Sequence, residues 1–206
     1  MFTWDHDFTY CIGILASDGN ISKDGRHIKF ISKDLYIIEI CKKVLKPNCR
    51  ITTQSRAQEK IKRYFVLQFS DVKLVRFLHT TGIHPAKSKT IESVSVPDIF
   101  FADFIRGLFD GDGSISLINH PESKHLQVKL RFYSASRLFL EWIHKKLIFH
   151  LGISGGSISF GARCYALSFG KADAGKIIKF MYYSNNLSCL DRKKQLCGQV
   201  VELVYT

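Results

Sequence analysis

The sequence predicts an α+β fold made of two copies of one unit, in which a helix, a β-hairpin, a second helix, a second hairpin and a third helix follow in order. The stretch TYCIGILASDGNIS, residues 9–22, resembles DFIRGLFDGDGSIS, residues 103–116, and further matching blocks follow both in the same order. Alternating apolar residues mark the strands, and helical spacing marks the helices. We therefore expect a pseudo-twofold duplicated chain, with a first repeat at 1–87, a linker at 88–97 and a second repeat at 98–206.

The first helix of each copy has an unusual C-terminal end. The run 101–109 reads as a helix that ends on acids followed by glycine, and Asp18 stands in the first copy where Asp112 stands in the second. The C-terminal end of a helix carries partial negative charge and disfavours anions, although a glycine there is an ordinary left-handed stop. Two costly carboxylates at matching places therefore indicate a functional pair.

Small residues lie four apart in these two helices, Gly13 with Ser17 and Gly107 with Gly111. That spacing places each pair on one helix face, where missing side chains let two backbones approach closely. We expect the helices to pack side by side at the pseudo-twofold axis. Their C-terminal ends then converge, and the two carboxylates meet.

Hairpins and helices complete each copy. The turn signal KDGR at 23–26 precedes an alternating strand, and apolar residues within 35–45 and 138–147 keep helical spacing. A last helix closes each copy, and Asp98 is expected to cap the helix at 101–109. In the returning strand of the first copy, alternation predicts inward-facing Phe65, Leu67 and Phe69 and outward-facing Tyr64, Val66 and Gln68.

The charge balance indicates a polyanionic partner. The 206 residues include 30 Lys and Arg against 18 Asp and Glu, a net charge of +12, and the pI is about 9.5. This favours nucleic acid over a membrane surface. Neither a signal or transit peptide nor an apolar run of membrane-spanning length is recognised, so we expect an intracellular protein of the cytoplasm or an organelle matrix, not a secreted one. Six cysteines without metal-site spacing are expected to fill the core in a reducing compartment.

The converging acids predict a cation site. A divalent ion held by carboxylates and backbone carbonyls would offset both the acids and the helix ends, and Mg²⁺ suits a site shared with phosphate oxygens. Two carboxylates and metal ions beneath a basic, twofold-related pair of sheets describe a metal-assisted phosphodiester hydrolase.

Polar and basic side chains on the outward faces of the strands and in the neighbouring turns form the predicted nucleic-acid surface. A two-stranded ribbon fits the DNA major groove, where such side chains reach base edges. The candidate DNA-binding residues are Asn20, Ser22, Arg26, His27, Lys29, Ser32, Gln54, Arg56, Lys62, Tyr64, Gln68, Ser116, Gln127, Lys129, Arg131, Tyr133, Ser134, Ser157, Ser159, Arg163 and Ser168.

These residues carry a resemblance to a known family. CIGILASDG, at 11–19, and IRGLFDGDG, at 105–113, resemble the two copies of the LAGLIDADG motif in single-chain homing endonucleases, and the matching flanks extend the resemblance over essentially the whole chain. The resemblance implies a saddle of two antiparallel sheets over DNA. It also implies a monomer that hydrolyses both strands across the minor groove at a long, nearly palindromic site, as in intron homing.

The resemblance also assigns roles at the motif. The last acid of each motif, Asp18 or Asp112, would be a metal ligand serving one strand, and Ser17 and Gly111 would offer backbone carbonyls to metal. Asp110 occupies the motif's earlier acid position. Because the first copy has alanine there, we expect Asp110 to be a cap or a supporting group and not a required ligand.

Basic and polar residues outside the motif complete the implied site. The family places basic residues near the scissile phosphates late in each repeat, where HPAKSK and LDRKKQ indicate Lys87 and Lys193 as catalytic residues. Ser32 and Ser134 hold the place of a water-positioning side chain, for which serine is short. The alternative basic residues are Lys89, Arg192 and Lys194.

The expected function is therefore that of a site-specific double-strand DNA endonuclease that uses Mg²⁺. Mn²⁺ is expected to substitute, and Ca²⁺ to bind without supporting cleavage. One alternative is a maturase that binds its host intron RNA with weak or absent cleavage, and another is a DNA-binding regulator on the same fold. Retention of both acids argues against a cleavage-dead version.

Overall fold

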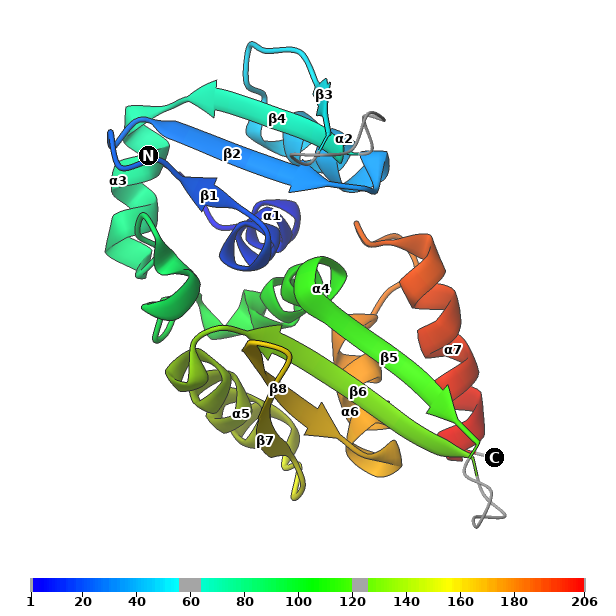
Figure 1. The fold of residues 1–206 in the computed structure, drawn as a ribbon. Helices are drawn as coiled ribbons and strands as arrows, with labels where there is room; N and C mark the ends of the chain where they lie inside the picture. The colour runs from blue at the N-terminus through cyan, green and yellow to red at the C-terminus, as the bar shows by residue number, and fades with distance from the viewer. Residues whose placement is uncertain (1, 56–63, 120–125, 206) are drawn as a thin grey trace.

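The computed structural model describes residues 2–55, 64–119 and 126–205 and has the predicted α+β fold with two antiparallel sheets (Figure 1). The first half contains α1 (His6–Ser17), β1 (Asn20–Ile21), β2 (His27–Ser32), α2 (Leu35–Leu45), β3 (Thr52–Gln54), β4 (Tyr64–Ser70) and α3 (Val72–Thr81). Two 3-10 turns, η1 (Lys87–Lys89) and η2 (Asp98–Phe100), follow. The second half contains α4 (Phe101–Asp112), β5 (Gly113–Ile118), β6 (Gln127–Ser134), α5 (Arg137–Leu151), β7 (Ser157–Gly161), β8 (Cys164–Phe169), α6 (Lys171–Met181) and α7 (Asp191–Tyr205).

The two sheets have the same topology. Their strand orders are β1-β2-β4-β3 and β5-β6-β8-β7, and every neighbouring pair is antiparallel. The registers match as well, because Phe30 pairs with Leu67 in the first sheet and Phe132 with Leu167 in the second. All four side chains are buried, which fixes the face that each sheet turns toward its helices.

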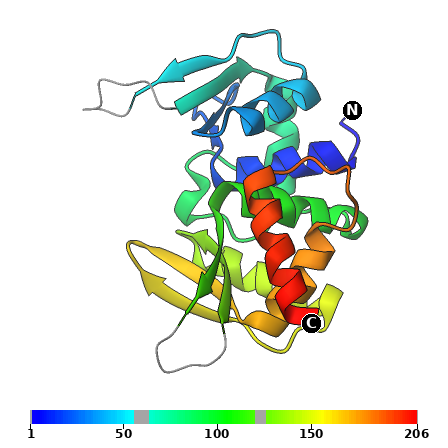
Figure 2. The ribbon, with the colours of Figure 1, turned by 90° about the vertical axis from the view of Figure 1, so that its right-hand side faces the viewer.

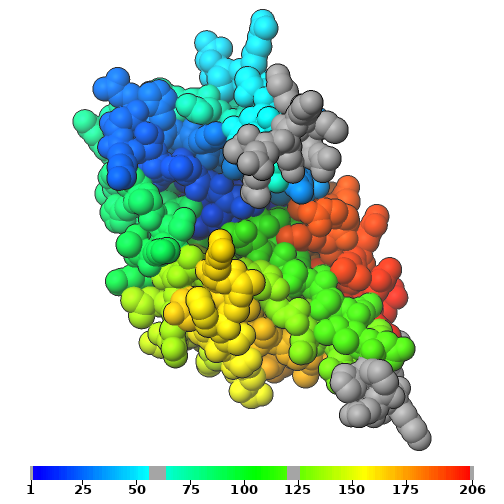
Figure 3. All heavy atoms as spheres, in the orientation of Figure 1, coloured from blue at the N-terminus to red at the C-terminus, as the bar shows by residue number. Residues whose placement is uncertain are grey.

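Helices cover only one face of each sheet. In Figure 1 the strands lie in front of the helices, and in the perpendicular view of Figure 2 the sheets occupy one side of the molecule while the helices occupy the other. The opposite faces of both sheets therefore form one side of the protein, and Figure 3 shows that side with atoms from both halves of the chain. This is the side on which the predicted DNA-binding residues were expected.

The helices α1 and α4 lie between the sheets and pack closely against each other (Figure 1). A Cβ added at Gly13 would lie 2.8 Å from Leu108 N, and one added at Gly107 would lie 3.1 Å from the Gly13 Cα and overlap Tyr10 O. A Cβ at Gly111 would likewise overlap Ser17 Oγ. The predicted small-residue face is thus the joint between the two halves.

The ends of α1 and α4 differ from the prediction in one respect. The helix α4 continues through the acids to Asp112, and neither Gly19 nor Gly113 is left-handed. These glycines are required by space instead, because a Cβ at Gly113 would lie 2.5 Å from Phe109 O and one at Gly19 would lie 2.7 Å from Leu15 Cα. The chain folds back over the last helical turn.

The segment between the sheets is packed, and Asp98 does not cap α4. Ile91 and Val94 are buried in the core. The Asp98 carboxylate pairs with Lys146 Nζ at 2.7 Å, while the N-cap position of α4 is Phe100. The predicted capping role of Asp98 is therefore wrong.

A polar cluster joins α4 to the first residue of α1 and to the connection between α6 and α7. Arg106 is fully buried and donates to Asp103 Oδ1 at 2.7 Å and to the backbone carbonyls of Met181 and Ser188. Asp103 also accepts from Tyr183 OH and lies 2.9 Å from His6 Nδ1. These bonds satisfy a charge that would otherwise be costly to bury.

Candidate functional site

The two motif carboxylates meet at the joint between α1 and α4. Asp18 is the C-cap of α1 and Asp112 is the last residue of α4, and their carboxyl groups lie close enough to interact electrostatically. The sequence-based expectation that the two acids are close together agrees with this geometry.

The protein environment disfavours the ionised forms of Asp18 and Asp112. Although Asp18 reaches solvent, desolvation by the surrounding protein and repulsion from Asp112 raise the pKa of its carboxyl to about 7. Desolvation also raises the pKa of Asp112, against the attraction of Lys87 and Lys193. A pair held in this way favours either a proton or a cation.

Two buried lysines flank the pair. Lys87, in η1, is 4% exposed and donates to Gly19 O at 2.7 Å and to Ser17 O at 3.4 Å. Lys193, in the first turn of α7, is 8% exposed and donates to three carbonyl oxygens at the end of α4. Burial lowers the pKa of both ammonium groups, that of Lys87 to about 8. Each lysine therefore binds the end of one motif helix.

The alternative basic residues are placed differently. Arg192 lies at the protein surface and forms an ion pair with Asp34 at 2.8 Å. Lys194 donates to Asn185 O, and Lys89 is exposed. Of the predicted basic residues, Lys87 and Lys193 are thus the two that contact the helix ends.

The Asp110 carboxylate is hydrogen bonded to residues outside the acid pair. Its Oδ2 accepts from Tyr10 OH at 2.9 Å and from Leu190 N at 2.8 Å, and burial raises its pKa to about 6. Asp110 therefore ties α4 to α1 and to the start of α7. This arrangement fits a supporting role and explains why the first motif can lack the acid.

The donor set fits a hard cation. Within residues 2–55, 64–119 and 126–205, no cluster of three His, Cys, Asp or Glu side chains has a metal-binding arrangement. The acid pair therefore needs backbone oxygens to complete a coordination sphere, and the Ser17 and Gly111 carbonyls adjoin it in sequence. Carboxylate and carbonyl oxygens are ligands that Mg²⁺ and Ca²⁺ prefer.

Two depressions open beside the acids, and each combines both halves of the chain. One is lined by Asp18 and Ser32 from the first half and by Gly111 from the second. The other is lined by Asp112 and Ser134 from the second half and by Ser17 from the first. The two predicted water-positioning serines thus occupy corresponding places, and each hydroxyl oxygen accepts from the backbone N–H two residues later.

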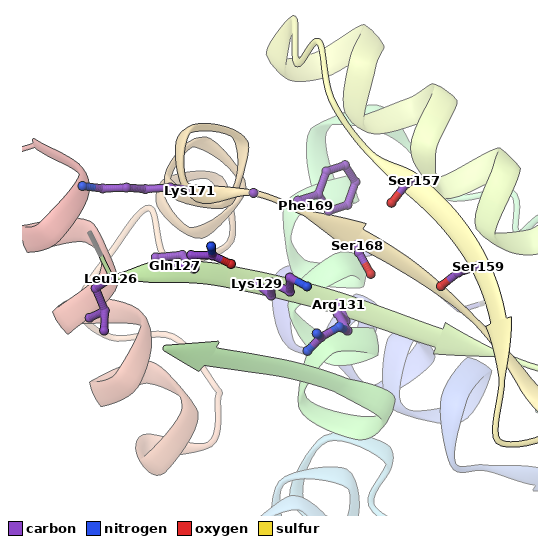
Figure 4. A pocket seen from close by; sticks show the side chains of 11 residues that line it. Leu126, Gln127, Lys129, Arg131, Ser157, Ser159, Ser168, Phe169 and Lys171 are labelled. Carbon is purple, nitrogen blue, oxygen red and sulfur yellow. The ribbon is translucent and has the colours of Figure 1, made fainter. Parts of the chain in front are cut away.

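The second sheet forms an open hollow of about 570 Å³ on its uncovered face. Figure 4 shows Gln127, Lys129 and Arg131 in a row along β6, with serine side chains from β7 and β8 beside them. Of the predicted residues, the hollow is lined by Gln127, Lys129, Arg131, Ser157, Ser159 and Ser168. Nearby, Arg131 donates to Ser116 Oγ, and Tyr133 OH lies 3.3 Å from Ser114 Oγ.

The first sheet carries a smaller counterpart. Its lining includes the predicted residues Asn20, Ser22, His27, Lys29 and Gln68. Lys29 Nζ donates to Gln54 Oε1 at 2.9 Å, which joins two more predicted positions. Arg26 and Arg163 are exposed in the turns that precede β2 and β8.

Two residues that alternation placed on the open face are less accessible than predicted. Tyr64 is only 8% exposed and Val66 is buried, although Tyr64 lines the depression at Asp18 and both residues alternate with Leu67, which belongs to the core. The Tyr64 ring lies under Lys33 Nζ, at 5.5 Å from the ring centroid, and Val66 pairs with Ile31 and Thr52. The predicted residues Arg56 and Lys62 lie outside the described residues.

The cysteines are free, and four of them are buried as predicted, whereas Cys49 and Cys164 are half-buried. Sequence analysis missed Asp24, whose carboxylate contacts the His27 ring, and it missed Asp34. An acid within a basic strand face was the available signal for Asp24. Across the described residues, no helix is both long enough and apolar enough to span a membrane.

Comparison with known proteins shows the same architecture. Residues 100–155 match the LAGLIDADG-like domain family, and no curated protein matches the sequence. The LAGLIDADG homing endonuclease I-LtrWI, solved bound to target DNA, is 10% identical with a TM-score of 0.66, over 96% of this chain and 90% of that chain. I-GzeII, another such endonuclease solved with its DNA target, is 11% identical with a TM-score of 0.64, over 98% of this chain and 91% of that chain.

A further similar structure is the N-terminal LAGLIDADG domain of DUF199/WhiA. It is 17% identical with a TM-score of 0.58, over 92% of this chain and 88% of that chain. Identities this low show a common fold and leave activity open. The chain thus contains a LAGLIDADG-like domain at 100–155 and has, over nearly its whole length, the fold of the LAGLIDADG homing endonucleases.

Proposed function

We propose that this protein is a site-specific endonuclease that hydrolyses both strands of duplex DNA with the help of Mg²⁺. The observation that carries the proposal is the pair of carboxylates, Asp18 and Asp112, held together between two buried lysines at the joint of the two halves. A DNA-binding domain without catalysis has no need for two adjacent anions at negative helix ends. The fold by itself does not decide, because the similar structures are not all described as endonucleases.

Duplex DNA as the partner is supported by the basic, uncovered sheet faces. A net charge of +12 suits a polyanion, and Lys29, Lys129 and Arg131 lie where β-strand side chains can reach base edges. The similar endonucleases I-LtrWI and I-GzeII were solved with their DNA targets. Since both halves of the site belong to one chain, we propose that the protein acts as a monomer at a long, nearly palindromic target, as expected for intron homing.

The chemistry can be assigned to residues of this chain. Asp18 and Asp112, with the Ser17 and Gly111 carbonyls, would hold the divalent ion, which when bound supplies an activated water and neutralises charge on the leaving oxygen. The water oxygen adds to phosphorus and loses its proton, while the phosphorus–oxygen bond to the leaving group breaks and that oxygen gains a proton. Lys87 and Lys193 would keep the two helix ends in place and add positive potential beside the phosphates.

The deciding experiment is a cleavage selection. The protein is incubated with a randomised linear duplex library and Mg²⁺, and the cut ends are sequenced. We expect defined double-strand cuts in Mg²⁺ or Mn²⁺ and binding without cleavage in Ca²⁺.

The matched controls are Asp18→Asn and Asp112→Asn, which keep side-chain size and remove an anion. Each is expected to abolish double-strand cleavage and to retain tight binding of the selected duplex. Full cleavage by either variant would exclude the proposed site. Tight duplex binding without cuts by the unmodified protein would favour a regulator, and preferential binding of a folded intron RNA would favour a maturase.

A further inference from the structure

The two depressions beside the acids occupy corresponding places but differ in charge. The charged residues Lys33, Asp34, Asp110 and Arg192 also line the depression at Asp18, whereas the position in the Asp112 depression that corresponds to Lys33 carries Ala135. Among the described residues that line the Asp112 depression there is no lysine or arginine. The electrostatic environment of the two sites is therefore unequal.

Beside each depression a contact joins distant parts of the chain, and the two contacts are of different kinds. Asp34 and Ser136 follow β2 and β6 at the same distance, and each lies at the N-cap of the next helix. Asp34 reaches across to Arg192 as an ion pair at 2.8 Å. Ser136 instead donates through its hydroxyl to Ile91 O, in the segment between the sheets.

The Asp34 side chain forms this ion pair and does not cap α2. Aspartate at an N-cap ordinarily accepts from a backbone N–H of the first turn, as Ser136 does from Phe139 N at 3.3 Å. The Asp34 side chain makes no such bond. Both of its oxygens face the Arg192 guanidinium, at 2.8 Å from the terminal nitrogen and 3.4 Å from Nε.

The ion pair holds Arg192 beside the acid site. Arg192 immediately precedes Lys193, and in the first half the residue that precedes Lys87 is Ala86. The first half thus offers no guanidinium at the corresponding place. A planar guanidinium held by a carboxylate is pre-oriented, and its remaining N–H groups suit phosphate oxygens.

We propose that the two cleavage sites are unequal and that Asp34 is a positioning residue, which holds Arg192 toward the phosphate in the Asp18 depression so that this strand is cut first. The inference rests on the proposed endonuclease function. Arg192 would stabilise the negative charge that develops on the phosphate in the transition state. The other strand, in the Asp112 depression, would be cut without such a cation, and nicked DNA would accumulate.

The test measures the cleavage rate of each strand separately. The protein in excess is mixed with a duplex that contains its selected target and is labelled differently on the two strands, and a supercoiled plasmid reports nicked and linear products. The unmodified protein is expected to cut one strand faster. Arg192→Ala should reduce the cleavage rate of that strand about tenfold and leave the rate of the slower strand essentially unchanged. The reduction is smaller than that for removing a fully buried hydrogen-bond donor, because the guanidinium is partly solvated.

Asp34→Ser separates positioning from simple charge. Serine is a good N-cap residue and is found at the corresponding place in the second half, so α2 should remain folded. Removing an anion near a phosphate would by itself speed cleavage of the nearby strand. If Asp34 positions Arg192, cleavage of the same strand should instead become slower. Arg192→Lys keeps the positive charge but lacks the planar guanidinium, so its cleavage rate should be intermediate.

The matched control is Lys146→Ala. It removes the ion pair between Lys146 and Asp98, which has a similar N–O distance of 2.7 Å, and it should change the cleavage rate of neither strand. Equal strand rates in the unmodified protein, an equal loss on both strands in Arg192→Ala, or a faster strand in Asp34→Ser would each overturn the inference. Failure of the proposed function has a different signature, namely no cut in either strand by the unmodified protein.

Discussion

The ammonium group of Lys193 takes part in an unusually complete set of backbone hydrogen bonds. It donates to Phe109 O, Asp110 O at 2.9 Å and Gly113 O at 2.7 Å, which lie where α4 ends. The last carbonyls of a helix have no intrahelical partner and carry partial negative charge. Lys193 therefore satisfies the helix end that also carries the second motif acid.

Lys193→Met should destabilise the protein by about 2 kcal/mol, because carbonyl oxygens that are partly buried would lose their donor. Urea unfolding followed by circular dichroism measures this difference. Lys89→Met, at an exposed position, is the control and should change stability by less than about 0.5 kcal/mol. A Lys193→Met variant as stable as the unmodified protein would mean that these bonds do not contribute to folding.

The sequence predicted the residues of the acid pair and its lysines better than their contacts. Position in the repeat identified Asp18, Asp112, Lys87 and Lys193, and the structure brings all four to one junction. The pairing of Asp34 with a residue of the other half was not predicted. Nothing in a local pattern distinguishes an N-cap aspartate that caps its helix from one that points elsewhere.

Among the elements, the joint between α1 and α4 depends on missing side chains. Gly107 lies against the backbone of α1, where an added Cβ would be 3.0 Å from the Tyr10 carbonyl carbon and would overlap the carbonyl oxygen. The two helices cannot separate without moving the acid pair. Packing of this joint and geometry of the site are therefore linked.

Gly107→Ala should destabilise the fold by about 3 kcal/mol, because the helices must move apart to admit the methyl group. Gly198→Ala is a control of the opposite sign. Gly198 lies in α7 with open space around its Cα, and alanine there should stabilise by about 0.5–1 kcal/mol through helix propensity. Thermal unfolding of the two variants side by side measures both effects, and equal shifts would contradict this description of the joint.

Strand β6 should determine base preference. Lys129→Ala and Arg131→Ala are each expected to change the preferred bases at a few target positions more than they change overall affinity, because side chains on this face would reach the base edges of a bound duplex. Binding profiles on a randomised target library measure this. Lys43→Ala, an exposed lysine on α2, removes the same charge from the helix side and should leave the profile unchanged.

Alternation predicted the faces of both β6 and β4, but it predicted exposure well only in β6. In β6 the buried and accessible positions alternate along the strand, whereas in β4 both Tyr64 and Val66 are buried on the face that was expected to be open. A strand pattern reports which side chains share a face, but the exposure of that face depends on neighbours such as Lys33 over the Tyr64 ring. The glycines after the acids were misread for a related reason, since crowding and left-handed geometry both select glycine.

For the molecule as a whole, the net charge of +12 and the two open sheets predict salt-sensitive binding. A surface that neutralises roughly six phosphates gives a slope of about −5 for log affinity against log salt, through counterion release. Fluorescence anisotropy on the selected duplex in EDTA measures the slope without cleavage. A flat dependence would contradict a surface that follows the phosphate backbone.

The duplicated architecture was readable from the sequence because four matching blocks follow one another in order. The helix α7 was not predicted as an element beyond the repeat. Its apolar residues Cys197 and Val200 are buried, and their helical spacing was the available signal. The fold class was thus predictable from the internal repeat. The additional helix could have been predicted only from the spacing of apolar residues after the second repeat.

The position of Lys193 in α7 means that the two halves are not interchangeable modules. In the first half the buried ammonium group belongs to Lys87 in the short turn η1. In the second half it belongs to Lys193 in α7, a helix that has no counterpart among the described elements of the first half. A symmetrised protein built from two copies of residues 98–181 would keep both acids and both sheets. It would have lost every ammonium group that now binds a motif helix end, so duplication of the visible repeat would not regenerate the site.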